Sequence, residues 1–199
     1  MPLPPPAARQ PMHTRRAEFR GYRRDDGLWD IEAELTDVKP YGFEIEGEGA
    51  WLPGQPIHHM HLRVTLDDAW TIHDIAVAMD AHPHAPCPQT MAPLRGLIGE
   101  RMGRGWRKII EQRLGGERGC THLRDLLVQL ATAAFQTRAP DAFAPGDDGR
   151  PPPHLGTCLT WAFDSPVVQR RYPLFYRPAA SAVADVPPSA TVSERSPSP

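Results

Sequence analysis

The chain has 199 residues, of which 40% are hydrophobic and 23% are charged, and its formal net charge is -2. This length and composition are typical of one globular domain, and a net charge so close to zero offers no basic field for nucleic acid or an anionic membrane surface. No apolar run is long enough to span a bilayer, and the first residues lack the basic and apolar regions of a signal peptide. We therefore expect a cytoplasmic protein with neither a nucleic-acid nor a membrane partner.

The 24 prolines gather near the two ends of the chain. Segments rich in Pro, Ser and Ala bury too little apolar surface to offset the conformational entropy lost on folding. We therefore predict a flexible N-terminus over residues 1–12, a single domain over 13–177 and a disordered tail over 178–199. The three cysteines are an odd number, so we expect thiols or metal ligands rather than a disulfide framework.

The first half of the chain predicts strands. Trp29, Ile31, Ala33 and Leu35 alternate with polar residues, which is typical of a half-buried strand. A weaker alternation covers residues 41–48. Asp37 lies between these two signals and is an expected turn residue.

The clearest prediction is a hairpin of residues 57–66 and 69–79, with Asp67 and Asp68 as a two-residue turn. Met60, Leu62, Val64 and Leu66 share its apolar face, and His58 lies on that face as a core histidine. If Leu66 pairs with Ala69, counting outward places His61 opposite Asp74, on the other face with His59. A loop of another length would shift this register.

The second half predicts helices. Pro93 suits a first helical turn, and an apolar stripe at helical spacing runs from Leu94 to Leu114. The glycines within it indicate either a helix broken in two or a helix packed closely against a partner backbone. A second helix is predicted from Cys120 to Gln136. Residues 155–176 are expected to pack back on the sheet. The order of strands and then helices predicts an α+β fold, with an antiparallel sheet covered on one face by two helices.

Cys120 and His122 form the first candidate site. The N-terminus of a helix stabilises an anion and lowers the pKa of a thiol placed there, and His122 would act as a base or as a metal ligand. The alternative is that Cys120 is a small buried hydrophobic residue and Thr121 only caps the helix.

A second candidate site is the turn that contains His82, His84 and Cys87, which three prolines stiffen. Imidazole and thiolate are the ligands that zinc and iron accept. A metal site would draw its ligands from this turn together with Cys120 and His122. The alternative is a rigid loop with solvated histidines.

A third candidate site is His59 and His61 with Asp74 on the polar face of the hairpin. A carboxylate that fixes the tautomer of an imidazole makes it a competent general base near neutral pH. The alternative is a structural pair. No phosphate-binding loop, dinucleotide fingerprint, serine nucleophile elbow or zinc-protease motif occurs in the sequence.

The chain resembles bacterial domain-of-unknown-function family 2889 between residues 14 and 176. The most distinctive similarity is Gly119-Cys120-Thr121-His122-Leu123, and the others lie at 24–29, 57–60, 86–88, 94–99, Cys158 and 171–173. The resemblance implies a role in the catabolism of lignin-derived aromatic compounds. A distant similarity to iron-sulfur assembly scaffolds rests on the order of elements and on Cys87, but Pro88 and Gln89 stand where those scaffolds have aspartate and glycine.

The candidate acid-base residues favour a small enzyme, and the resemblance implies that it acts on a phenolic or aromatic acid. We expect a carbon-carbon lyase that releases an aldehyde by His/Asp acid-base chemistry, with or without zinc or iron bound by Cys and His. The alternatives are a non-catalytic metal-binding or scaffold-like protein and an interaction module that uses the Pro-rich ends. Among assemblies, a homodimer is the one that we count as compatible with this prediction.

Overall fold

The computed structural model of the chain describes residues 3–139 and 149–179. The chain divides into two compact units, Met1–Asp141 and Ala142–Pro199. Each unit is described by itself below. Most of the predicted tail, from residue 180 onward, lies outside the described residues.

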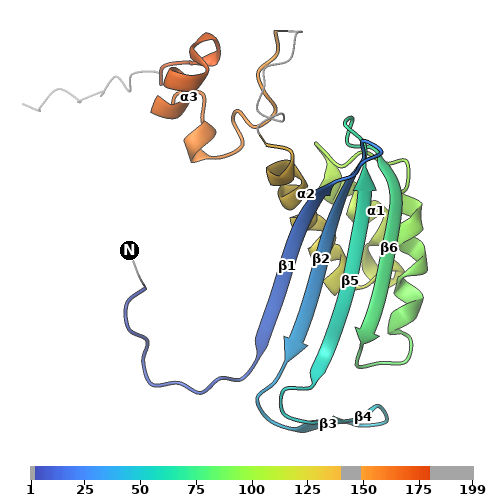
Figure 1. Ribbon diagram of the computed structural model, residues 1–199. Helices are drawn as coiled ribbons and strands as arrows, with labels where there is room; N and C mark the ends of the chain where they lie inside the picture. The colour runs from blue at the N-terminus through green and yellow to red at the C-terminus, as the bar shows by residue number, and fades with distance from the viewer. Residues whose placement is uncertain (1–2, 140–148, 180–199) are drawn as a thin grey trace, which may run out of the picture. The chain divides into compact units, whose positions relative to one another are not determined.

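The first unit is built on an antiparallel sheet of four strands in the order β1-β2-β5-β6 (Figure 1). Its strands are β1 (Thr14–Arg23), β2 (Trp29–Val38), β5 (Pro56–Leu66) and β6 (Ile72–Ala81). A separate hairpin of β3 (Phe43–Ile45) and β4 (Gly49–Trp51) connects β2 to β5. The weak alternation predicted over 41–48 corresponds to this hairpin.

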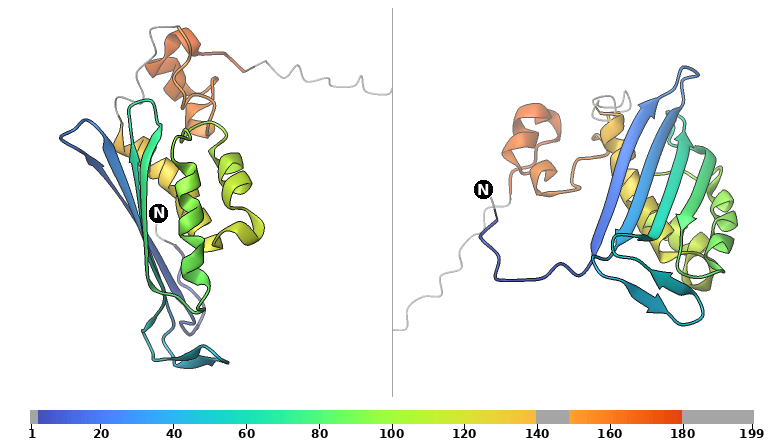
Figure 2. Two further views of the ribbon diagram at one scale, coloured as in Figure 1. Left: turned by 90° about the vertical axis from the view of Figure 1, so that its right-hand side faces the viewer. Right: turned by 60° about the horizontal axis from the view of Figure 1, so that its bottom comes forward.

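Helices cover one face of the sheet and leave the other face open, as the edge-on view of Figure 2 shows. The helical segments are the 3-10 helices η1 (Cys87–Thr90), η2 (Ala92–Leu97) and η3 (Gly116–Arg118), and the α-helices α1 (Trp106–Leu114) and α2 (Thr121–Thr137). The predicted helix over 94–114 is broken in two between Gly99 and Gly105, both with positive φ. The predicted α+β fold is confirmed.

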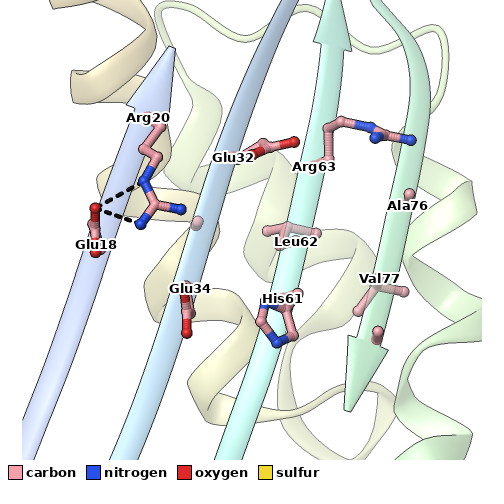
Figure 3. Close-up of a pocket in the computed structure, with 11 residues that line it drawn as sticks. Glu18, Arg20, Glu32, Glu34, His61, Leu62, Arg63, Ala76 and Val77 are labelled. Carbon is pink, nitrogen blue, oxygen red and sulfur yellow. Dashed lines mark hydrogen bonds and ion pairs between the residues drawn. The ribbon is translucent and has the colours of Figure 1, made fainter. Parts of the chain in front are cut away.

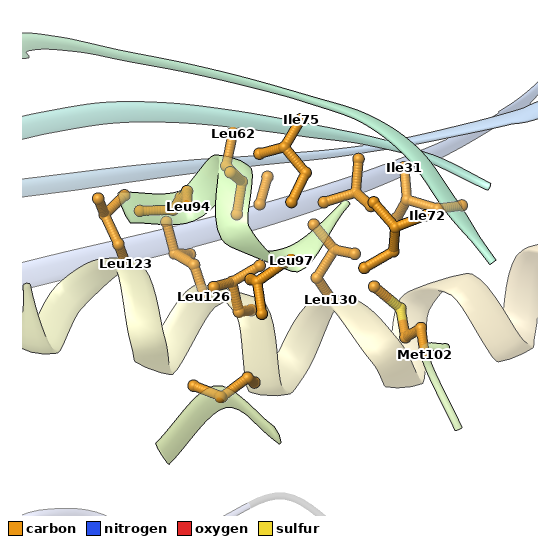
Figure 4. Packing of buried hydrophobic residues seen from close by; sticks show 14 of the residues in the cluster. Ile31, Leu62, Ile72, Ile75, Leu94, Leu97, Met102, Leu123, Leu126 and Leu130 are labelled. Carbon is orange, nitrogen blue, oxygen red and sulfur yellow. The ribbon is translucent and has the colours of Figure 1, made fainter. Parts of the chain in front are cut away.

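The core lies between the covered face of the sheet and the helices (Figure 4). Every second residue of β2 is buried, from Trp29 to Asp37, as expected for a strand with one face on the core. The indole Nε1 of Trp106 donates to the carbonyl of Leu127 at 2.9 Å, which joins α1 to α2. The labelled core residues of Figure 4 are Ile31, Leu62, Ile72, Ile75, Leu94, Leu97, Met102, Leu123, Leu126 and Leu130.

The predicted two-residue turn between β5 and β6 is wrong. Leu66 pairs with Ile72, and the connection runs from Asp67 to Thr71, closed by a bond from the Thr71 amide to Asp67 Oδ1 at 2.8 Å. A bulge follows Thr65. As a result His61 lies opposite Ala78, and the predicted pairing of His61 with Asp74 does not form.

The sequence patterns did not predict β1, which is an edge strand. Nine of its ten residues are exposed and Phe19 is half-buried, so the strand carries almost no apolar alternation. It is nevertheless paired with β2 over its whole length, from Thr14 opposite Val38 to Arg23 opposite Trp29. Asp37, predicted as a turn residue, lies inside β2 and opposite Arg15 of β1.

The second unit contains the 3-10 helices η5 (Leu159–Trp161) and η6 (Pro173–Phe175) and the short helix α3 (Pro166–Arg171). Ser165 caps α3, because its Oγ accepts a hydrogen bond from the amide of Val168 at 3.1 Å. The packing of residues 155–176 on the sheet stays a prediction. Within the described part of the chain, no helix has the length and apolar character needed to cross a membrane.

Candidate functional site

A cluster of polar side chains lies where the apolar core ends, between the sheet and the N-terminus of α2. We call it the Asp37 cluster and define it as Asp37, His58 and His122 with their neighbours His13, Arg15 and Cys120. Asp37 and His58 are direct cross-strand partners on β2 and β5. Both continue the core-facing rows of their strands, Asp37 after Leu35 and His58 before Met60.

Asp37 is the centre of this cluster and is only 2% exposed. Its Oδ1 accepts from His13 Nε2 at 2.9 Å and from Arg15 Nε at 2.8 Å, and its Oδ2 accepts from Arg15 Nη2 at 2.8 Å. The paired bonds from Arg15 have the bidentate geometry in which a guanidinium binds a carboxylate most strongly. Burial raises the pKa of Asp37, but Arg15 and His58 outweigh it, so the pKa lies below its ordinary value.

His58 Nδ1 lies 3.0 Å from Asp37 Oδ2. Because Asp37 is ionised, Nδ1 carries the hydrogen and donates it to the carboxylate, which leaves the lone pair on Nε2. Burial lowers the pKa of His58, and the nearby His122 lowers it further. His58 is therefore a neutral imidazole near pH 7, with Nε2 able to accept a proton.

His122 is the second imidazole of the cluster. Its ring centroid lies 4.0 Å from that of His58, and its Nε2 lies 4.0 Å from Asp37 Oδ2. Burial, followed by the positive charge of Arg15, lowers the pKa of His122. Two neutral imidazoles thus stand side by side at a carboxylate, and the three residues each offer a ligand atom within 4.8 Å of the others.

Cys120 occupies the N-cap position of α2, as the sequence predicted for the start of this helix. Its Sγ lies 3.6 Å from His122 Nδ1. The thiol and the carboxylate therefore approach His122 from its two ring nitrogens.

The turn with His82, His84 and Cys87 is held by contacts of its own. His82 Nδ1 lies 3.0 Å from the carbonyl of His84, and His84 Nδ1 lies 2.9 Å from Glu48 Oε1. Neither of the two groups of three metal-ligand residues found in the described part of the chain includes a residue of this turn. The structure thus does not bring Cys87 together with Cys120 and His122 in such a group.

His59 and His61 lie on the open face of the sheet, where their carboxylate neighbours are not the one predicted. His59 Nε2 lies 2.9 Å from Glu34 Oε1, and His61 Nε2 lies 3.1 Å from Asp80 Oδ2. Asp74 instead pairs with Thr65. Because of the bulge and the longer turn between β5 and β6, Asp74 lies further along the sheet than predicted, and Asp80 lies beside the two histidines.

A family model described as "Protein of unknown function (DUF2889)" matches residues 13–136, which is more than half of the chain. The chain belongs to this family. The matched range covers every residue of the Asp37 cluster, from His13 to His122. No curated protein and no solved structure gave a significant match to this DUF2889 protein, and the similarity to iron-sulfur scaffolds stays without support.

Proposed function

We propose that this DUF2889 protein is a small enzyme whose active site is the Asp37 cluster. The proposed reaction is the cleavage of a carbon-carbon bond in a phenolic compound of lignin-derived aromatic catabolism, with release of an aldehyde. The observation that carries the proposal is the neutral His58, held through Nδ1 by the buried carboxylate of Asp37. Such an arrangement is what a general base requires near neutral pH.

In the proposed reaction, His58 Nε2 removes the proton of a substrate hydroxyl group. The oxygen electrons form the carbonyl of the leaving aldehyde while the carbon-carbon bond breaks, and its electron pair stays on the carbon next to the aromatic ring. This carbon then takes a proton from the His58 imidazolium or from a neighbouring acid. The step is redox-neutral, so it needs no oxidant. His122, whose ring centroid lies 4.0 Å from that of His58, is the second proton carrier.

Asp37 and Arg15 act on the substrate only through His58. The carboxylate fixes the His58 tautomer and stabilises the imidazolium that forms during the reaction. Arg15 keeps the carboxylate ionised in spite of its burial. Both are therefore positioning residues, and their replacement should change the pH profile of turnover as well as its rate.

The test is an assay of the full chain for aldehyde release from phenolic compounds that carry a hydroxymethyl group on the carbon next to the aromatic ring. We expect His58→Gln to lower kcat by about 100-fold or more, the usual contribution of a general base. His73→Gln is the matched control, because His73 is an exposed histidine near the start of β6, outside the Asp37 cluster, where its ring bonds Asp67. Wild-type turnover by the folded His58→Gln variant would disprove the assignment.

A specific observation also favours a second candidate function, a metal-binding protein without turnover of its own. Two histidines and one carboxylate, each with a ligand atom within 4.8 Å of the others, form a set that divalent zinc or iron accepts. Elemental analysis of protein purified without an affinity tag separates the two. Stoichiometric metal that His122→Gln removes, in a protein with no aldehyde-releasing activity, would favour this second function.

A further inference from the structure

The open face of the sheet carries a second group of metal-ligand side chains, separate from the Asp37 cluster. The group is Glu34 of β2 with His59 and His61 of β5, and each offers one ligand atom within 4.8 Å of the others. His59 and His61 are two residues apart, so they lie on the same face of the strand. Glu34 is the cross-strand partner of His61, which brings the carboxylate to the same side.

The distances within this group suit a shared ion. His59 Nε2 lies 2.9 Å from Glu34 Oε1, and the two imidazole rings lie 4.5 Å apart between centroids. Ligand atoms that are each about 2.0–2.2 Å from a zinc ion lie roughly 3–4 Å from one another. Small rotations of these side chains therefore bring all three onto one ion without movement of the backbone.

A second carboxylate stands behind the histidines. Asp80 Oδ2 lies 3.1 Å from His61 Nε2 and 3.8 Å from His59 Nδ1. Histidines that bind a metal through one nitrogen usually donate the other N–H to a carboxylate, which fixes the ring. Asp80 is placed for this role towards either ring.

The group borders a hollow in the open face, with a volume of about 270 Å³ (Figure 3). Glu34 and His61 line the hollow together with Arg20 and Arg63, and Figure 3 shows Arg20 bonded to Glu18. A three-ligand ion here would keep an open coordination position toward this space. The two arginines share the lining with three glutamates, Glu18, Glu32 and Glu34, so the hollow carries no excess of positive charge.

We propose that Glu34, His59 and His61 bind a divalent transition-metal ion, of which zinc is the natural probe, with an open position toward the hollow. The site does not depend on the function proposed for the Asp37 cluster. Its ligands are a third exposed on average, with side-chain exposures of 28% for His59, 34% for Glu34 and 41% for His61. An ion therefore reaches them directly from solvent.

The chemistry of the group suits a transition-metal cation. Glu34 offers a carboxylate oxygen and the two histidines offer imidazole nitrogens, which are ligands that divalent zinc accepts.

The experiment is calorimetric titration of zinc into the full chain, purified without a tag and freed of metal by a chelator. Cobalt titrated in place of zinc reports the ligand set through its visible absorption. We expect one zinc equivalent that Glu34→Gln and His61→Gln each weaken by more than about tenfold. The His59→Gln/His61→Gln double variant should lose this equivalent altogether, and His73→Gln should keep it.

The Asp37 cluster is the competing source of zinc binding, so His58→Gln/His122→Gln is titrated as well. The proposal requires that this variant still binds the equivalent that Glu34→Gln weakens. The proposal is overturned if wild-type protein binds no zinc at micromolar concentration. It is also overturned if the folded His59→Gln/His61→Gln variant binds as tightly as wild type, or if all binding disappears in His58→Gln/His122→Gln. Far-ultraviolet circular dichroism establishes folding, and the replaced side chains on the open face contribute nothing to the core.

Discussion

Asp37 shows how a single residue converts a core-facing position into a site. It occupies the last place in a row of buried residues on β2, after Leu35, where a carboxylate has almost no contact with water. An isolated charge there would be costly, and burial by itself would favour the protonated form. The bidentate bond from Arg15 reverses the balance, and the resulting charge holds His58 in one tautomer.

The pKa values of His58 and His122 predict how stability depends on pH. Both lie below the ordinary value of 6.5, mainly because the rings are buried. Below pH 6.5 the unfolded chain therefore binds more protons at these two positions than the folded chain does. The free energy of unfolding should rise with pH through this window and level off above it.

Urea unfolding at several pH values between 5 and 8 measures this dependence. The His58→Gln/His122→Gln variant should show a smaller rise than wild type, because two of the responsible groups are gone. Some rise should remain, since burial also lowers the pKa of His154 in the second unit. An unchanged profile in the double variant would contradict the pKa argument.

The sequence pattern indicated the position of Asp37 in the cluster, but the prediction of Asp37 as a turn residue did not use it. The alternation from Trp29 to Leu35 places Asp37 on the core face if it is continued by one step, and the same step from Met60 places His58 there. What the pattern lacked was β1, whose Arg15 neutralises the carboxylate. A sequence pattern does not favour burial of an aspartate unless a cationic partner can be identified. That partner, Arg15, lies on an exposed edge strand, which has little apolar alternation by which to recognise it.

At the scale of elements, the contact between β1 and α2 depends on a glycine. A side-chain carbon added at Gly21 would overlap the Thr137 side chain at the end of α2, so only glycine lets the helix approach the edge strand this closely. This contact explains why a mostly exposed strand is held in place beyond its hydrogen bonds to β2.

Gly21→Ala should therefore lower the free energy of unfolding by about 1–3 kcal/mol, the usual cost of overpacking. Thr137→Ala in the same chain should restore part of the loss, because it removes the atoms that the new methyl group meets. Gly96→Ala is the matched control: nothing lies within 4 Å of its added carbon, and we expect a change within about 0.5 kcal/mol. Denaturant unfolding of wild type, Gly21→Ala, Thr137→Ala and the double variant forms a double-mutant cycle that measures the coupling. Additive effects would contradict the contact.

The helices and central strands were predictable because their apolar periodicity is strong. The register of the β5–β6 hairpin was not, since it depends on a turn that combines local Asp67–Thr71 bonds with a long-range contact from Arg138. Arg138 donates to the carbonyl of Asp68 at 2.9 Å and lies over the ring of Trp70, which has a positive φ of 68°. An arginine from the end of α2 thus helps fix the turn that decides which carboxylate meets His61.

At the scale of the whole molecule, the large hydrophobic cluster belongs to one unit. All members of the hydrophobic cluster lie between Trp29 and Ala134, within the unit Met1–Asp141. The family match ends at residue 136, close to the end of α2. Both candidate sites also draw all their residues from this unit.

A chain that ends at Ala139 should consequently fold by itself. We expect a cooperative thermal transition within about 3 °C of the corresponding transition in the full chain, because every residue of the hydrophobic cluster is retained. Zinc binding by Glu34, His59 and His61 should be unchanged. A chain that ends at Arg118 is the informative comparison: it lacks α2, whose five buried residues cover the sheet, and should expose that apolar face and aggregate. If the chain ending at Ala139 instead melts without cooperativity, the second unit stabilises the sheet through contacts that the core cluster does not contain.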